Sequence, residues 1–125
     1  MSKILLIEDN ADSREIFRTV LEREKFEVIA AVDGEEALEK IDSGKFSVIL
    51  ADMSLPKISG WELIGIIKKK HPSTPLIAVT AHAMSGDKER AIKAGCDDYI
   101  SKPLKPGDLV EKVKKYVKWN SENEK

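Results

Sequence analysis

The segment VILADMSLP, residues 48 to 56, places an aspartate directly after a run of apolar residues. Such a run is typical of a strand that is buried on both faces of a parallel sheet, and Asp52 falls where this strand ends. A carboxylate at the mouth of a buried strand is costly to remove from water, so it usually has a charged partner or a chemical role. The segment therefore predicts a central strand and a functional aspartate at its end.

Four further short apolar segments occur along the chain, and helical patterns separate them. Three of the five segments are continuous apolar runs. In residues 12–26, for example, Ile16, Phe17, Val20 and Leu21 fall on one side of a helix. Strict alternation of strands and helices with short links predicts a parallel sheet with right-handed crossovers and helices on both faces. The expected strands are residues 3–8, 27–31, 47–52, 75–80 and 97–101.

Glycine and proline mark the expected helix ends. Gly44 and Gly95 each follow a helical pattern and are suited to cap its carboxyl end. Pro72 fits a position just beyond a helix, and Pro106 fits the first turn of the last helix.

Composition narrows the class of protein. A chain of 125 residues with 42% hydrophobic residues suits one compact domain. Its formal net charge of −1 comes from 21 basic and 22 acidic residues that are interspersed, so we expect neither nucleic acid nor a membrane as partner. The lone Cys96 can form no internal disulfide, and the first apolar run is too short for a signal peptide, so we predict a cytoplasmic protein.

Polar side chains follow the expected strands at their carboxyl ends, where open α/β sheets bind ligands. These residues are Glu8 and Asp9 after the first strand, Asp52 after the third, Thr80 after the fourth and Lys102 after the fifth. Clustered carboxylates raise one another's pKa unless a cation offsets their charge, and Mg²⁺ prefers such oxygen ligands. One carboxylate could then attack a phosphoryl group while the lysine and the hydroxyl hold its oxygens. The pattern predicts phosphoryl transfer to an aspartate.

The motifs Glu8-Asp9, DMSLPKISG (52–60), TAHA (80–83) and KP (102–103) resemble, in order and spacing, the receiver domain of two-component response regulators. The resemblance extends from Lys3 to about Trp119 and is similar to the stand-alone, single-domain type. It implies a flavodoxin-like, doubly wound (βα)5 fold with strand order 2-1-3-4-5. Residues 1–119 would form the receiver domain and residues 120–125 a disordered tail.

By this resemblance Asp52 is the phosphoacceptor and Mg²⁺ is the cofactor. Asp9 would bind the metal directly, Glu8 would act chiefly through water, and the main-chain carbonyl of Ser54 would complete the protein ligands, with Asp52 itself contributing an oxygen. The acidic pair here is Glu-Asp instead of Asp-Asp, which leaves the role of Glu8 open.

The resemblance also assigns the residues that read the phosphoryl group. Lys102 would contact its oxygens, and a cis peptide bond before Pro103 would aim that lysine into the site. Thr80 would hydrogen-bond the phosphoryl group in the active state, and Tyr99 would act with it as a switch residue. Packing alone is an equally good account of Tyr99 from the residues themselves.

The resemblance implies partners in signalling. The phosphoryl group would come from a phosphohistidine on a sensor histidine kinase or a histidine phosphotransferase, or from a small donor such as acetyl phosphate. The chain would catalyse only its own phosphorylation and dephosphorylation. A downstream protein target would bind the face formed by the fourth helix, the fifth strand and the fifth helix.

Three other functions compete with this assignment. An aspartyl-nucleophile phosphatase needs a second aspartate two residues after the nucleophile, where this chain has Ser54. A nucleotide- or flavin-binding module needs a phosphate-binding loop after the first strand, where EDNADSRE (8–15) carries acids. An adaptor of receiver fold that works without phosphorylation stays open, although the complete set of site residues argues against it.

Overall fold

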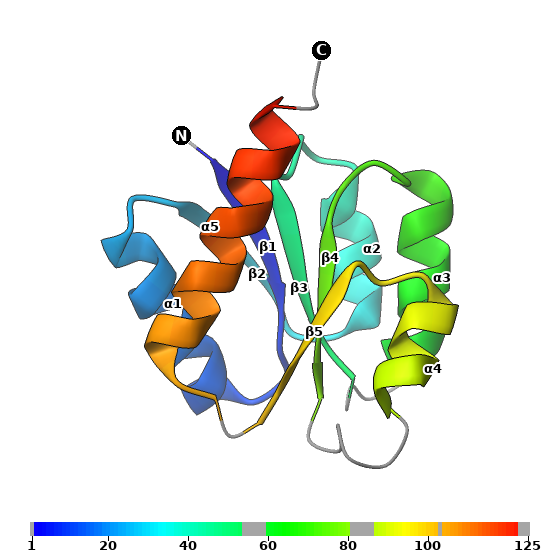
Figure 1. The fold of residues 1–125 in the computed structure, drawn as a ribbon, viewed down its shortest axis with the longest axis horizontal. Coiled ribbons are helices and arrows are strands. Elements are labelled where there is room, and N and C mark those ends of the chain that lie inside the picture. The colour runs from blue at the N-terminus through cyan, green and yellow to red at the C-terminus, as the bar shows by residue number, and fades with distance from the viewer. Residues whose placement is uncertain (1, 54–59, 81–86, 103, 123–125) are drawn as a thin grey trace.

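The computed structural model describes residues 2–53, 60–80, 87–102 and 104–122. Their five strands pair in parallel in the order β2-β1-β3-β4-β5, which confirms the predicted sheet (Figure 1). The elements are β1 Lys3–Ile7, α1 Ala11–Arg23, β2 Glu27–Ala31, α2 Gly34–Ile41, β3 Val48–Asp52, α3 Gly60–Lys70, β4 Leu76–Thr80, α4 Asp87–Ala94, β5 Asp98–Ser101 and α5 Pro106–Glu122.

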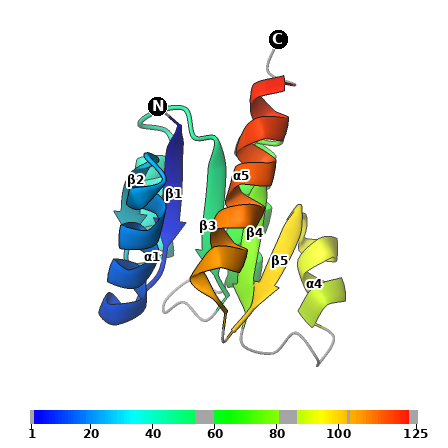
Figure 2. The same ribbon diagram turned by 60° about the vertical axis from the view of Figure 1, so that its left-hand side comes forward.

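Helices cover both faces of the sheet: α1 and α5 lie on one face, and α2, α3 and α4 lie on the other (Figures 1 and 2). Each face has its own core, because side chains of a strand alternate between faces. In β1, Ile4 and Leu6 pack with α1 and α5, whereas Leu5 and Ile7 pack with α2 and α3. Every residue of β3 and β4 is buried, as their continuous apolar runs predict.

The helix ends agree with the sequence at three positions and differ at one. Pro72 lies two residues beyond the end of α3, Gly95 follows α4 with a φ of +114°, and Pro106 opens α5. In addition, Asn10 caps α1 by accepting a 2.9 Å hydrogen bond from the Ser13 amide. Gly44 is not the predicted cap, because α2 ends at Ile41. The amide and hydroxyl of Ser43 already bond the carbonyl of Lys40 there, so no left-handed glycine is required.

Two further expectations need correction. Ile16 is 54% exposed, because the stripe of α1 that reaches the core is centred on Phe17 and Leu21. Helix α5 continues to Glu122, into the segment predicted to be a disordered tail, because a formed helix propagates through polar residues at little cost. Residues 123–125 of that tail lie outside the described residues.

The strand order changes direction between β1 and β3: β2 is added on one side of β1, and β3 and the later strands are added on the other. Strands β1 and β3 are therefore neighbours, although β2 lies between them in sequence. Their carboxyl ends meet at the lower edge of Figure 1. Side chains that follow β1 and β3 are thereby brought together at the place where ligands bind in open α/β sheets. Among the described residues, no helix is both long enough and apolar enough to span a membrane.

Candidate functional site

Three carboxylates meet at this edge of the sheet. Strands β1 and β3 pair with Ile7 beside Ala51, so the next residues, Glu8 and Asp52, are also neighbours. One carboxylate oxygen from each of Glu8, Asp9 and Asp52 lies within 4.8 Å of the others. Hard divalent cations such as Mg²⁺ prefer oxygen ligands of this kind, so the donor set fits the predicted metal.

The three acids differ in their access to water. Glu8 is 1% exposed and Asp52 is 3% exposed, whereas Asp9 is an exposed residue. Desolvation therefore destabilises the charged forms of Glu8 and Asp52 most, and the cluster opens to solvent on the side of Asp9.

Lys102 lies between the two buried acids. Its Nζ is 3.3 Å from Glu8 Oε1 and 3.3 Å from Asp52 Oδ2. Its main-chain amide donates a 2.7 Å hydrogen bond to the Thr80 carbonyl, which fixes the turn after β5 against the end of β4. Desolvation acts to lower the pKa of Lys102, but the negative charges of Asp52 and Glu8 outweigh it and the pKa is raised. The ammonium is therefore held charged beside Asp52.

The pKa of Glu8 is strongly changed by the surroundings of this residue. Burial, a hydrogen bond with Asp52 and the negative charge of Asp52 raise the pKa of Glu8 from 4.5 to about 7. The nearby ammonium of Lys102 lowers this pKa without cancelling the effect. The charge of Lys102 alone does not neutralise three acids, and a divalent ion would supply further positive charge.

This environment predicts an unusual pH dependence of stability in protein freed of divalent cations. The pKa of Glu8 is about 7 in the folded state and 4.5 is its ordinary value, so the folded state binds the extra proton between these limits. Stability should therefore fall as pH rises through this window, by up to about 3 kcal/mol from this one group. Urea unfolding with a chelator at several pH values measures it. A Glu8→Gln variant should lose this component, and a wild-type slope in that variant would contradict the assignment.

The structure places Thr80 and Tyr99 on the neighbouring strands β4 and β5, where Tyr99 pairs with Ala78, two residues before Thr80. Thr80 is the last residue of β4, is 2% exposed and pairs with Ser101 of β5. Tyr99 is half-buried and packs against the core on the α2 and α3 face. Of the predicted site residues, Ser54 and Pro103 lie outside the described residues, so their assignments stay predictions.

Helix α3 closely approaches Met53, the residue after Asp52 at the end of β3. A Cβ added to Gly60 would lie 2.5 Å from the Cα of Met53, the residue after Asp52. Only glycine allows the first turn of α3 to pack this closely against that backbone. The sequence signal was the glycine at the end of DMSLPKISG, but a glycine alone does not say which backbone it contacts.

We expect Gly60→Ala to destabilise the protein by roughly 1–3 kcal/mol, because the new methyl group clashes with backbone that cannot easily move. Gly65→Ala is the matched control in the same helix, since nothing lies within 4 Å of a Cβ at that position. The control should gain up to about 1 kcal/mol of stability from helix propensity. Urea or thermal unfolding measures both, and equal effects in the two variants would show that the close approach is unimportant.

Known proteins resemble this chain along almost its full length. The family model for the response regulator receiver domain matches residues 4–114. The chain is 37% identical over 116 residues to the polar-differentiation response regulator DivK of Brucella anthropi, covering 91% of this chain and 94% of that protein. It is 36% identical over 131 residues to hybrid signal transduction histidine kinase I of Dictyostelium discoideum, covering 94% of this chain but only 8% of that protein.

A solved structure agrees with these relatives. The CheY-like response regulator receiver domain protein from Methanospirillum hungatei JF-1 superposes with a TM-score of 0.92 at 32% identity, covering 98% of each chain. The acidic cluster at the carboxyl ends of β1 and β3 fits the aspartyl phosphate and Mg²⁺ site of such domains. With the fold, the cluster and these matches in agreement, the chain belongs to the response regulator receiver domain family.

Proposed function

We propose that this protein is a response regulator that accepts a phosphoryl group on Asp52 and signals through the resulting change of conformation. The observation that carries the proposal is the contact of Lys102 with Asp52 and Glu8, beside the cluster that includes Asp9. This arrangement leaves a buried carboxylate between a cation and two further acids, in a chain of the receiver family.

In the proposed reaction an oxygen of Asp52 attacks the phosphorus of a partner phosphohistidine. The new O–P bond forms as the P–N bond breaks, and the imidazole leaves with the bonding electron pair. Lys102, already 3.3 Å from Asp52, would contact the phosphoryl oxygens. Asp9, Glu8, Asp52 and the carbonyl of Ser54 would hold Mg²⁺, which neutralises charge that develops during transfer.

The signal would begin at Thr80 and pass to Tyr99 on the neighbouring strand. A phosphoryl group on Asp52 would favour a state in which Thr80 moves toward it, and this would vacate space for the ring of Tyr99. Lys112 of α5 is placed to follow such a change, because its Nζ is 3.1 Å from the Tyr99 carbonyl and 5.9 Å from the centre of the ring.

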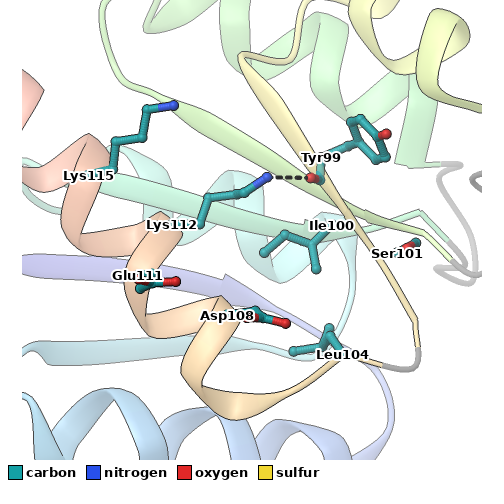
Figure 3. Close-up of a pocket in the computed structure, with 8 residues that line it drawn as sticks. All are labelled: Tyr99, Ile100, Ser101, Leu104, Asp108, Glu111, Lys112 and Lys115. Atoms are coloured by element: carbon teal, nitrogen blue, oxygen red, sulfur yellow. Dashed lines mark hydrogen bonds between the residues drawn. The ribbon is translucent and has the colours of Figure 1, made fainter.

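A downstream protein target would bind the face formed by α4, β5 and α5. A hollow of about 720 Å³ lies on its β5 and α5 side, between Tyr99 and the first turns of α5 (Figure 3). It is lined by apolar and charged residues, which suits a protein partner: Tyr99, Ile100, Ser101, Leu104, Asp108, Glu111, Lys112 and Lys115. We place this exchange in the cytoplasm, with a sensor histidine kinase or a histidine phosphotransferase as donor.

Phosphotransfer profiling tests the proposal. The purified chain is mixed with each phosphorylated histidine kinase or phosphotransferase of the source organism, with Mg²⁺ or with a chelator. We expect rapid loss of label from one donor and its appearance on this chain only with Mg²⁺. A target that binds equally with and without a phosphodonor, and a chain that no donor labels, would instead support the phosphorylation-independent adaptor.

A further inference from the structure

We propose that Arg14 is a positioning residue that holds the acidic loop in the geometry needed to bind Mg²⁺. This inference rests on the proposed function, because it assumes that Glu8, Asp9 and Asp52 are the metal site. It concerns a side chain on α1 that, among the described residues, forms no ion pair with a carboxylate and instead reaches back to the loop before its own helix.

Arg14 provides hydrogen bonds to three consecutive carbonyl groups. Its Nη1 donates to the carbonyl oxygens of Glu8 at 3.0 Å and Asp9 at 3.3 Å. Its main-chain amide donates to the carbonyl oxygen of Asn10 at 2.9 Å. The whole turn between β1 and α1 is therefore tied to one residue in the first turns of α1.

The rest of the loop is fixed at its ends. The Glu8 amide donates a 3.0 Å hydrogen bond to Ala31 of β2, and the side chain of Asn10 caps α1. Between these points, within the part of the chain that the structure describes, the hydrogen bond of the Asp9 carbonyl is the one from Arg14. Asp9 is the exposed acid of the cluster, so its backbone needs this support most. The direction of its carboxylate depends on that backbone.

An electrostatic role and a positioning role of Arg14 predict opposite changes in Mg²⁺ affinity when Arg14 is replaced. A guanidinium near the acids repels a divalent cation, so a purely electrostatic role means that its loss tightens Mg²⁺ binding. A positioning role means that its loss weakens Mg²⁺ binding, because a loose loop must be ordered when the ion binds. Groups that orient metal ligands typically change metal affinity by about 10-fold to 100-fold when removed. The sign of the change therefore separates the two roles.

Arg18 offers a matched control. It lies one turn further along α1, and its Nε has no hydrogen-bond partner in the described parts of the chain. Arg14→Met and Arg18→Met remove the same charge and keep an apolar stem, but only the first removes the side-chain hydrogen bonds to the carbonyls of Glu8 and Asp9. Arg14→Lys keeps the charge and one donor group, so it should recover part of the lost affinity.

The test is a calorimetric titration of the folded, purified chain with Mg²⁺, together with amide hydrogen exchange of residues 8–13 in the metal-free protein. We expect Arg14→Met to bind Mg²⁺ about 10-fold more weakly than Arg18→Met and to exchange faster in the loop. Equal or tighter binding by Arg14→Met than by Arg18→Met would overturn the inference. So would unchanged exchange of the loop.

An Asp9→Ala variant in the same titration separates this inference from the proposed function. Loss of Mg²⁺ binding in Asp9→Ala, with equal binding by the two methionine variants, rejects the role of Arg14 alone. Wild-type binding by Asp9→Ala rejects the metal site itself, and the role of Arg14 with it.

Discussion

Asp52→Asn is expected to abolish the Mg²⁺-dependent phosphorylation of this chain, from acetyl phosphate and from a phosphohistidine donor alike. An amide keeps the shape of the side chain but lacks the negative oxygen that attacks phosphorus. It also weakens the contact with Lys102 Nζ, which is 3.3 Å from Asp52 Oδ2 in the structure. Labelling should fall to the background seen with a chelator, as measured by radiolabel or by a phosphate-affinity gel.

Asp12→Asn is the control for this result. Asp12 is an exposed acid in the first turn of α1, and its replacement by asparagine removes the same negative charge close to the site. It should be labelled at the wild-type rate. If Asp52→Asn is labelled at the wild-type rate, the phosphoacceptor is another residue and the assignment of Asp52 is wrong.

Thr80→Ala should have the second large effect, on the signal and not on the chemistry. Thr80 is buried at the end of β4 and does not belong to the acidic cluster, so the variant should still accept phosphoryl groups. It lacks the hydroxyl that would read the new anion, and the two conformational states would no longer differ by that hydrogen bond. We expect most of the phosphorylation-dependent gain in target affinity to be lost.

This prediction is checked by the affinity of the target with and without a beryllofluoride mimic of the phosphoryl group. Thr74→Ala is the control, because Thr74 precedes β4 at its other end. It should show the wild-type gain. An equal gain in Thr80→Ala would mean that the signal leaves by another route, and the roles of Thr80 and Tyr99 would have to be withdrawn.

The sequence predicted the sheet well because its central strands are buried on both faces. Val48 to Asp52 and Leu76 to Thr80 are continuous apolar runs up to their last residues, a pattern typical of strands that are buried on both faces of a parallel sheet. Once the strands were known to be parallel, their carboxyl ends had to share one edge. This is why Glu8, Asp9 and Asp52 could be placed together before any distance was known.

Contacts between side chain and backbone were the part that sequence could not predict. The bonds from Arg14 to the loop depend on the rotamer of one long side chain, and the approach of Gly60 to Met53 depends on how α3 packs. Helical periodicity also placed Ile16 on the buried side of α1, although it is exposed. Periodicity fixes the spacing of an apolar stripe, but not which residue lies at its centre.

The most direct test of the account is to locate the phosphoryl group on the wild-type chain. The protein is phosphorylated with Mg²⁺ and acetyl phosphate, digested under acidic conditions that preserve acyl phosphates, and mapped by tandem mass spectrometry. We predict one phosphorylated residue, Asp52, and loss of its phosphoryl group in base. A phosphoryl group on Asp9, on Glu8 or on a histidine, with Asp52 unmodified, would contradict the central claim.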